Sequence, residues 1–531
     1  MPERFNACEY LLDRRVEAGD GARLALTGPA GDLTYAQLLD KVQRTASALR
    51  HLRLEPEQRI VMFMADSPEF VAVYLAAMRI GAIPVPVSTM LHADGLAELL
   101  HDSRARLLAI SPQFADLAAA ATAAVAAAGH ATELRAVVDP ERLTAAAAEG
   151  PGQSNTEPDP AIYPTTADFP AFWLYTSGTT GTPKAAMHRH ASIQVVCDTY
   201  GAQVLGIRAD DRCLSAAKAF FAYGLGNSLL FPLSVGACAI LEPAPSRPDL
   251  LAERAREYGA TLFFAGPTFF AGMLRAGLPS DALTAAGVRL ATSAGEALPK
   301  ALYERWTSHF KVDILDGIGM TEMLHIFLSN RPGQVRPGTT GVAVPGYDLK
   351  ILDESGAKVP AGQPGTLFVR GDSTATGYWS RFAASRTMFQ GEWLRTGDTY
   401  VQDADGYYTC LGRTGDMLKP SGIWVSPAEI EGRLLAHDAV AQAVVVAGLD
   451  GDGLEKTVAY VVLERDATVT EVELIEFCRA GLPAVKRPRR VVFVGSYPAT
   501  ATGKVRRVEL RDMATKLLAE ITEPLLVKDG A

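Results

Sequence analysis

The sequence predicts an α/β protein with a large N-terminal domain of parallel-sheet α/β subdomains plus a small β-subdomain, followed by a C-terminal α+β domain. Short apolar runs alternate with longer helical patterns over about the first 350 residues, which is typical of crossover units around a parallel sheet. Around 349–369 the pattern changes to short strands separated by Gly and Pro turns, which favours an antiparallel sheet. After Arg413, about 115 residues with their own strands and helices are enough for a separate domain. We therefore place a boundary at Gly415, giving domains 1–415 and 416–531.

Local patterns of apolar residues predict the individual elements. The segment 59–65 (RIVMFMA) predicts a buried strand, and 67–81 (SPEFVAVYLAAMRIG) predicts the helix after it. The alanine-rich segment 117–128 predicts a surface helix, because alanine has the highest helix propensity. The segment 150–168 is rich in Pro, Gly, Ser and Thr and predicts a loop. Further strands are expected at 106–110, 170–174, 261–266, 289–295, 442–449, 456–464 and 489–495, and C-terminal helices at 426–437 and 468–482.

Composition and charge exclude several classes of protein. The chain has 531 residues, with 51 Lys and Arg against 60 Asp and Glu, and a net charge of −9. This balance argues against binding to nucleic acid or a membrane surface through a basic field. The six cysteines form no CxxC pair, which argues against a zinc or redox site and is typical of a reducing compartment. With no secretory signal and no apolar run of about 18 residues, we expect a cytoplasmic protein.

A glycine- and hydroxyl-rich stretch, YTSGTTGTPK at 175–184, points to phosphate chemistry. Its glycines allow the backbone N–H groups to approach an anion closely, its Ser and Thr hydroxyls add donors, and Lys184 adds a compact positive charge. The spacing differs from the GxxxxGK[ST] pattern of a P-loop. Taken alone, the stretch could also be an ordinary glycine-rich turn.

This stretch resembles the phosphate loop of the adenylate-forming superfamily, which includes acyl- and aryl-CoA ligases, luciferases and peptide-synthetase adenylation domains. Four further segments match that superfamily in the expected order: GMTE at 319–322, RTGD at 395–398, a hinge segment at 412–431, and TGK at 502–504. Five ordered matches over about 330 residues argue against a chance resemblance. The resemblance implies that the C-terminal domain rotates about the hinge at Gly415.

The resemblance also implies a nucleotide site. Its catalytic residues are Thr321, Glu322 and Lys504, with Glu322 helping to hold Mg²⁺ and Lys504 bridging the substrate carboxylate and the α-phosphate. In isolation, Glu322 could be a solvated surface residue and Lys504 part of a solvent-facing basic loop. The ATP-binding residues implied are Thr176, Ser177, Gly178, Thr179, Thr180, Gly181, Lys184, Ala294, Gly295, Glu296, Asp316, Gly317, Ile318, Asp398 and Arg413.

Asp398 makes physical sense in this role, because a carboxylate in a turn can accept hydrogen bonds from two ribose hydroxyls. An aspartate that only caps a turn is the alternative. The chain departs from many relatives at two positions. Ile318 replaces the tyrosine that would stack on adenine, and Gly415 replaces an Asp or Lys at the hinge, with Asp416 following it.

Two segments, KAFFAYGLGN at 218–227 and GIGMTEMLHIFLSN at 317–330, resemble the benzoate-CoA ligase branch. An aryl acid needs a flat apolar slot with one closed end. The residues implied to line this slot are Ala222, Tyr223, Gly317, His325 and Ile326. Tyr223 and His325 could instead be ordinary core residues. The residues implied to bind coenzyme A are Lys419, Gly422, Lys486 and Arg487, although the basic cluster at 486–490 could equally be a solvated turn.

These resemblances predict an AMP-forming ligase that uses ATP, Mg²⁺ and coenzyme A as a monomer or homodimer. An aryl carboxylate would first form aryl-AMP with release of pyrophosphate, and the CoA thiol would then displace AMP. The alternatives are a stand-alone enzyme that loads an aryl acid onto a carrier protein and a non-catalytic nucleotide sensor. The sequence does not identify the ring substituents that are accepted.

Overall fold

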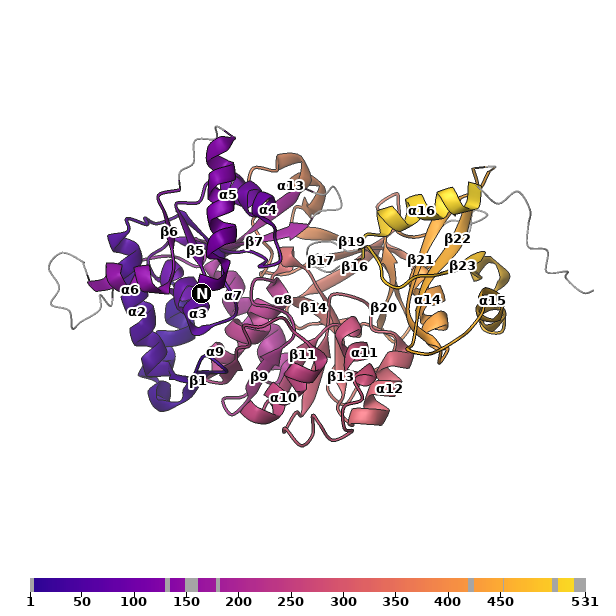
Figure 1. The fold of residues 1–531 in the computed structure, drawn as a ribbon, viewed down its shortest axis with the longest axis horizontal. Helices are drawn as coiled ribbons and strands as arrows, with labels where there is room; N and C mark the ends of the chain where they lie inside the picture. Colours follow the sequence, from indigo (N-terminus) through magenta and orange to yellow (C-terminus); the bar gives the residue numbers. More distant parts are fainter. Residues whose placement is uncertain are drawn as a thin grey trace, which may run out of the picture.

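The computed structural model describes residues 4–128, 134–148, 161–177, 182–418, 425–451, 453–498 and 505–519. Figure 1 shows the N-terminal elements and the strands β21–β23 at opposite ends of the molecule. No described helix is long and apolar enough to cross a membrane.

A nine-stranded sheet forms the centre of the N-terminal part. Its strand order is β15-β14-β13-β12-β11-β9-β10-β1-β2, and every pairing from β1 to β13 is parallel. The crossover pattern predicted from the sequence is therefore confirmed, and antiparallel strands occur only at the two edges of this sheet. The strands are β1 (Leu24–Thr27), β2 (Leu33–Thr34), β9 (Arg212–Ser215), β10 (Cys238–Ile240), β11 (Leu262–Ala265), β12 (Leu290–Ser293), β13 (Ile314–Gly319), β14 (Ile326–Ser329) and β15 (Val342–Ala343).

Helices connect the strands of this sheet, as crossover topology requires. They cover a core that includes Phe263, Phe270 and Trp306, all fully buried. The connecting helices are α7 (His190–Val196), η4 (Cys197–Leu205), α8 (Ala222–Leu225), η5 (Gly226–Leu230), α9 (Phe231–Val235), α10 (Pro248–Tyr258), α11 (Pro267–Arg275) and α12 (Lys300–Phe310), with the short η6 (Thr321–Met323) after β13.

A second, four-stranded parallel sheet has the order β4-β3-β5-β6. Its strands are β3 (Arg59–Phe63), β4 (Ile83–Pro86), β5 (Leu107–Ile110) and β6 (Ala136–Val138). The alanine-rich segment forms a surface helix as predicted, burying only the stripe of Ala118, Ala121 and Val125. The helices of this region are η1 (Glu9–Asp13), α1 (Arg14–Glu17), η2 (Asp20–Ala22), α2 (Tyr35–His51), α3 (Pro68–Arg79), α4 (Ala93–Ser103), η3 (Pro112–Phe114), α5 (Ala115–Ala127) and α6 (Pro140–Ala148).

Two antiparallel units complete the N-terminal part. Strands β7 (Pro170–Ser177) and β8 (Pro183–Arg189) form a hairpin. The β-subdomain expected after 349 is confirmed as a five-stranded antiparallel sheet, in which β20 pairs with β19. Its elements are β16 (Asp348–Leu352), β17 (Gly365–Arg370), α13 (Phe382–Met388), β18 (Phe389–Gln390), β19 (Trp393–Gln402) and β20 (Tyr408–Arg413).

The C-terminal elements form their own three-stranded sheet, in the order β21-β22-β23. Its contacts with the N-terminal part include α12 against α14 and a hydrogen bond of 3.5 Å from Arg275 Nη1 to the Ala441 carbonyl. The boundary at Gly415 stays a prediction. The elements are α14 (Pro427–Leu435), β21 (Val440–Leu449), β22 (Glu455–Leu463), α15 (Glu471–Arg479), η8 (Ala484–Lys486), β23 (Arg490–Phe493) and α16 (Arg507–Ala519).

Candidate active site

The predicted phosphate loop joins the two strands of the β7–β8 hairpin. The register pairs Thr176 with Lys184, so the loop lies between two hydrogen-bonded strands rather than between a strand and a helix. The Lys184 ammonium lies 5.7 Å from the ring centroid of Tyr378. The residues at 178–181 lie outside the described part of the chain, so the predicted roles of Gly178, Thr179, Thr180 and Gly181 stay predictions.

Glu322 lies on the short helix η6, directly after β13, and is only 4% exposed. Its Oε1 accepts a hydrogen bond from the Tyr378 hydroxyl, and the Ala375 N–H donates to its carbonyl at 2.8 Å. Tyr378 therefore links Glu322 to Lys184. Among the described residues, no group of three or more His, Cys, Asp and Glu is arranged to hold a metal by itself. A single carboxylate nevertheless fits Mg²⁺, which commonly takes one or two protein carboxylates and completes its shell with phosphate oxygens and water.

Thr321 is held by a histidine that the sequence analysis did not identify. His188 Nε2 lies 2.7 Å from the Thr321 carbonyl, and its ring stacks on Phe172 at 5.0 Å. Burial lowers the pKa of His188 to about 4, so the imidazole is neutral at physiological pH. Because a carbonyl only accepts, Nε2 carries the proton. His188 lies in β8, four residues after Lys184, and only that proximity could have indicated it.

Asp398 and Arg413 face each other across the β19–β20 pair. The Asp398 carboxylate is paired with Arg413 Nε at 3.1 Å. The backbone N–H of Asp398 donates to Thr396 Oγ1, also at 3.1 Å. Gly397, directly before Asp398, has a φ of +76°, a conformation that favours glycine. Asp398 is 6% exposed, so its carboxylate is fixed in place and can accept hydrogen bonds from a diol.

Asp316 lies beside the carboxyl end of β12, because Ser293 and Asp316 are partners in the β12–β13 register. Burial raises the pKa of Asp316 far above its usual range, and its Oδ1 has no hydrogen-bond partner among the residues described. An amino group such as that of adenine would supply the missing partner. Burial raises the pKa of the Cys410 thiol, and the charges of Asp398 and Asp316 add to the rise, so both carboxyls lie near this thiol.

The segment after β12 borders this carboxyl. Ala294 is buried, Gly295 has a φ of +95°, and Glu296 Oε2 accepts a hydrogen bond from Thr268 Oγ1 at 2.9 Å. Ile318 is half-buried in β13, next to Gly317. The nucleotide residues predicted after β12 and on β13 are thus neighbours in the structure, at the carboxyl ends of parallel strands, where ligands commonly bind.

The five residues predicted for the aryl slot also converge. His325 Nε2 lies 3.3 Å from the Tyr223 carbonyl, and the two rings are 5.5 Å apart. The Tyr223 hydroxyl is 2.6 Å from Thr292 Oγ1, which joins Ala222 and Tyr223 on α8 to strand β12. A Cβ on Gly317 would approach Ile326 Cγ2 to 2.9 Å, so glycine allows this side chain to pack there.

Two further aromatic residues, which were not predicted, pack around His325. Tyr200 and Phe231 lie 5.2 and 4.5 Å from the His325 ring, and both are fully buried. They come from η4 and from the start of α9, which are distant from His325 in sequence. Glycine is required at 226, since a Cβ there would meet His325 Cδ2 at 2.3 Å. No local pattern could have identified Tyr200 or Phe231.

The functional residues predicted after Gly415 are only partly described. Lys419, Gly422 and Lys504 lie outside the described residues, so their roles stay predictions. Lys486 Nζ pairs with Glu429 at 2.8 Å, and Arg487 Nε donates to the Leu482 carbonyl at 3.0 Å. A coenzyme phosphate would therefore have to compete with Glu429 for Lys486.

The predicted hinge contacts α16, the helix that follows the predicted catalytic lysine. Arg511 Nη2 donates to the Gly415 carbonyl at 2.8 Å and also contacts the Asp416 carboxylate. Arg507 pairs with Glu431 at 2.8 Å. A Cβ on Gly415 would meet nothing within 4 Å, so sterics alone do not require glycine in this arrangement.

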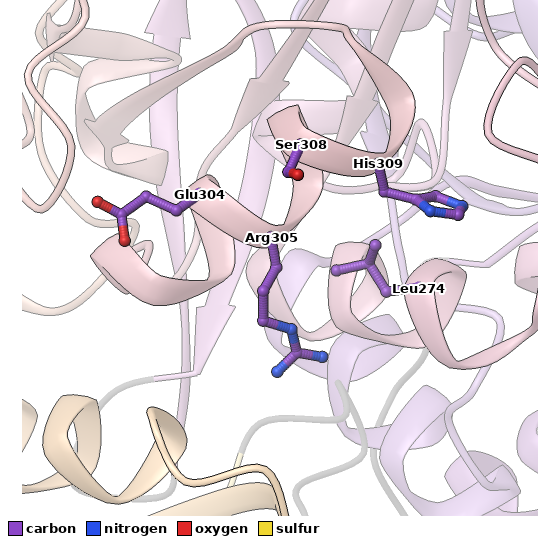
Figure 2. Close-up of a pocket in the computed structure, with 5 residues that line it drawn as sticks. All are labelled: Leu274, Glu304, Arg305, Ser308 and His309. Carbon is purple, nitrogen blue, oxygen red and sulfur yellow. The ribbon is translucent and has the colours of Figure 1, made fainter.

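A surface pocket of about 620 Å³ lies between α11 and α12. Figure 2 shows Glu304, Arg305, Ser308 and His309 on α12, with Leu274 on α11. None of the predicted site residues lines this pocket, so it is separate from the candidate active site.

Comparison with known proteins gives a consistent assignment. The family "AMP-binding enzyme" matches residues 12–379, and "AMP-binding enzyme C-terminal domain" matches residues 429–504. A benzoate–CoA ligase of Thauera aromatica is 41% identical over 517 residues, covering 96% of each chain. A 4-hydroxybenzoate–CoA/benzoate–CoA ligase of Rhodopseudomonas palustris is 40% identical, covering 97% of this chain and 95% of its own.

Solved structures agree with these matches. A benzoate CoA ligase from Burkholderia xenovorans LB400 aligns with a TM-score of 0.85 and 39% identity, covering 96% of this chain and 100% of that one. The anthranilate CoA ligase AuaEII, solved in complex with anthranoyl-AMP, aligns with a TM-score of 0.90 and 35% identity, covering 97% and 98%. Because the family model matches more than half of the chain and relatives above 30% identity cover nearly all of it, the chain belongs to the AMP-binding enzyme family.

Proposed function

We propose that the protein is an aryl-CoA ligase that converts benzoate or a substituted benzoate into its CoA thioester, with ATP as the second substrate and Mg²⁺ as cofactor. The observation that carries this proposal is the position of His325 in the aromatic slot, only four residues after Thr321 in the nucleotide site. An acid seated against His325 would thus present its carboxylate to the residues around Thr321 and Glu322. The full-length relatives named as benzoate–CoA ligases support the same acid and acceptor.

In the first step, a carboxylate oxygen attacks the α-phosphorus of ATP, the new C(O)–O–P link forms, and the bond to pyrophosphate breaks. Mg²⁺ bound to Glu322 would supply Lewis-acid stabilisation of the phosphates. Lys184 would offset their negative charge, and Asp398 would fix the ribose. His188 would hold the Thr321 segment in place through the 2.7 Å contact with its carbonyl. Lys504 would complete the site by contacting the oxygens that gain charge.

In the second step, the thiol of coenzyme A attacks the carbonyl carbon, the C–S bond forms, and AMP leaves. We propose that rotation about Gly415 replaces Lys504 with the loop containing Lys419 and Gly422. That rotation would require the contacts of Arg511 with Gly415 and Asp416 to rearrange. All six cysteines are free, and we propose that the enzyme works in the reducing cytoplasm.

The proposal is tested by incubating the protein with ATP, Mg²⁺, benzoate and either CoA or a phosphopantetheinylated carrier protein. We expect benzoyl-CoA, AMP and pyrophosphate in equal amounts, and no product without benzoate. The variant Glu322→Gln serves as the control for a trace contaminating ligase. Transfer to the carrier but not to CoA would replace the proposal with a carrier-loading enzyme. Absence of acid-dependent pyrophosphate release would overturn it.

A further inference from the structure

We infer that Asp102, near the end of α4, is a positioning residue for the phosphate loop, because it binds both segments that flank the start of strand β8, where Lys184 lies. The inference rests on the proposed function, since the loop is expected to act on ATP. It goes beyond that function by assigning a role to a residue outside the predicted site.

The carboxylate of Asp102 holds Tyr175, the first residue of the glycine- and hydroxyl-rich stretch. The Tyr175 hydroxyl donates to Asp102 Oδ2 at 2.7 Å, and Arg381 Nη2 donates to Asp102 Oδ1 at 2.6 Å. Burial raises the pKa of Tyr175 above its usual range, and the Asp102 charge adds to the rise, so the hydroxyl keeps its proton. A hydrogen bond to a carboxylate is stronger than one between neutral groups, so this contact fixes the tyrosine in place.

The backbone carbonyl of Asp102 holds Trp379. The indole Nε1 of Trp379 donates to this carbonyl at 3.0 Å. The Trp379 ring also lies 4.8 Å from that of Trp173, which precedes Tyr175 by two residues in β7. The Arg59 guanidinium lies 5.3 and 5.4 Å from the two tryptophan rings. The segment that contains Trp379 is therefore tied to the same end of α4 as Tyr175.

These two contacts meet at strand β8. Tyr175 is the partner of Ala185 in the β7–β8 register. The Trp379 N–H donates to the Ala185 carbonyl at 2.9 Å, from a segment that pairs with β8 through Tyr378. Asp102 thus joins the two neighbours of β8 at the residue directly after Lys184.

Lys184 itself lies on the opposite face of the strand. Successive side chains of a strand point to opposite faces, so Ala185 and Lys184 face different ways. Ala185 packs in the buried cluster that includes Leu99 of α4, whereas the Lys184 ammonium lies 5.7 Å from the Tyr378 ring centroid. Asp102 therefore acts through the backbone of β8 rather than on the nucleotide. Without its contacts the lysine would be free to shift, and a displacement of about 1 Å can slow a reaction substantially.

The test measures pyrophosphate release by the full chain, with ATP varied at saturating benzoate and benzoate varied at saturating ATP. Tyr175→Phe and Asp102→Ala are each expected to raise the KM for ATP about tenfold, the scale of losing a hydrogen bond to a charged group, and to leave the KM for benzoate unchanged. Asp102→Asn keeps one oxygen that can accept from Tyr175, so its KM for ATP is expected to lie between those of the native protein and Asp102→Ala. Adding Tyr175→Phe to Asp102→Ala is expected to have no further effect, because both remove the same contact.

Two variants serve as matched controls. Tyr303→Phe removes another tyrosine hydroxyl that donates to an aspartate, here Asp313 Oδ1 at 3.1 Å, on the distant helix α12. Asp94→Asn changes an exposed carboxylate on the same helix as Asp102. Both are expected to leave the KM for ATP and the KM for benzoate unchanged.

Tyr175→Phe removes a single oxygen, so it decides the outcome even if Asp102→Ala does not fold. The inference is overturned if the KM for ATP is unchanged in Tyr175→Phe or in a folded Asp102→Ala. It is also overturned if the KM for benzoate rises by the same factor, which is the result of a general loss of structure. Failure of the proposed function gives a different result, because the native protein would then release no pyrophosphate with any aryl acid. ATP affinity measured by equilibrium dialysis would still show whether the two variants weaken nucleotide binding.

Discussion

The nucleotide side of the candidate site and the aryl slot are held together in different ways. On the nucleotide side, charged groups have protein partners: Glu322 accepts from Tyr378, and Asp398 pairs with Arg413. In the predicted slot, the rings of Tyr200, Tyr223 and Phe231 pack around His325. The first arrangement holds charged groups by hydrogen bonds and an ion pair, and the second holds apolar surfaces by ring packing.

This difference has a kinetic consequence. A substitution on the nucleotide side acts on ATP and phosphate chemistry, so it is expected to slow the reaction of every acid by a similar factor. A substitution in the slot acts on the acid itself, so it is expected to change the order in which acids are preferred. Single substitutions on each side test whether the two sides act separately.

The largest effect is expected from Lys504→Ala. Loss of a cation aimed at the reacting oxygens is expected to lower the rate of adenylation about 10²–10³-fold for all acids, the scale of removing one transition-state donor. Thioester formation from supplied aryl-AMP is expected to persist, and rapid-quench assays of the two half-reactions separate the steps. Lys516→Ala, on an exposed position of α16, is the control. Equal loss in both half-reactions would show that Lys504 does not have this role.

Ala222→Phe is expected to lower kcat/KM for benzoate about a hundredfold, because a side chain that displaces the ring by 1 Å can cost this much. The phenyl group would fill the space beside Tyr223 in the slot. ATP binding, measured by equilibrium dialysis, is expected to be unaffected. Unchanged benzoate kinetics would remove Ala222 from the slot, and weakened ATP binding would break the division between the two sides.

Tyr378→Phe is expected to lower the rate about tenfold for every acid, because a hydrogen bond to a buried carboxylate contributes about 1.5–3 kcal/mol. The Mg²⁺ concentration for half-maximal rate is expected to rise, since the Glu322 carboxylate loses its fixed orientation. Titrations of Mg²⁺ with two different acids provide the measurement, and Tyr407→Phe, whose hydroxyl makes one exposed contact with Gln334, is the control. A change in acid preference would contradict a role limited to the nucleotide side.

The smallest effect on activity is expected from Asp66→Asn, which tests the support of the slot. Both carboxylate oxygens of Asp66 accept from the Ala219 N–H, at 3.1 and 3.3 Å, and Ala219 precedes Ala222 in the slot segment.

Burial raises the pKa of Asp66 from 3.8 to about 6, while the Lys218 charge opposes the rise and Glu242 adds to it. The folded state therefore favours the protonated acid. The stability gained from holding Asp66 in its protonated form is therefore present below about pH 4. It is lost as the pH rises through 6, because the folded protein must then bury the ionised carboxylate.

At roughly 1.4 kcal/mol per pKa unit, the loss amounts to about 3 kcal/mol. Asparagine keeps the acceptor but does not ionise. Denaturant unfolding at pH 4.5 and 7.5 is expected to show Asp66→Asn gaining stability relative to the native protein as the pH rises. The exposed Asp94→Asn is the control. A stability difference that does not vary with pH would show that Asp66 does not titrate in this range.

The two sides also differ in how well sequence predicts them. Lys184, Glu322 and Asp398 belong to short motifs whose glycines and hydroxyl residues can be recognised in the sequence. The structure places Lys184 near the start of β8, Glu322 on η6 and Asp398 directly after Gly397 in β19. The crossover strands of the central sheet were predictable for a similar reason, since each is a short apolar run that ends in turn residues. Tyr200, Phe231 and His188 were missed because each is an apolar or aromatic residue inside a helix or strand. Their role arises only when distant segments pack around His325 or Thr321.

The central claim is that one site joins an aryl acid to the α-phosphate of ATP before any thiol takes part. Exchange of labelled pyrophosphate into ATP in the absence of CoA measures that step directly. The account predicts exchange that requires both an aryl acid and Mg²⁺ and that is lost in Glu322→Gln. Exchange without an acid, or none with any aryl acid that binds the protein, would contradict it.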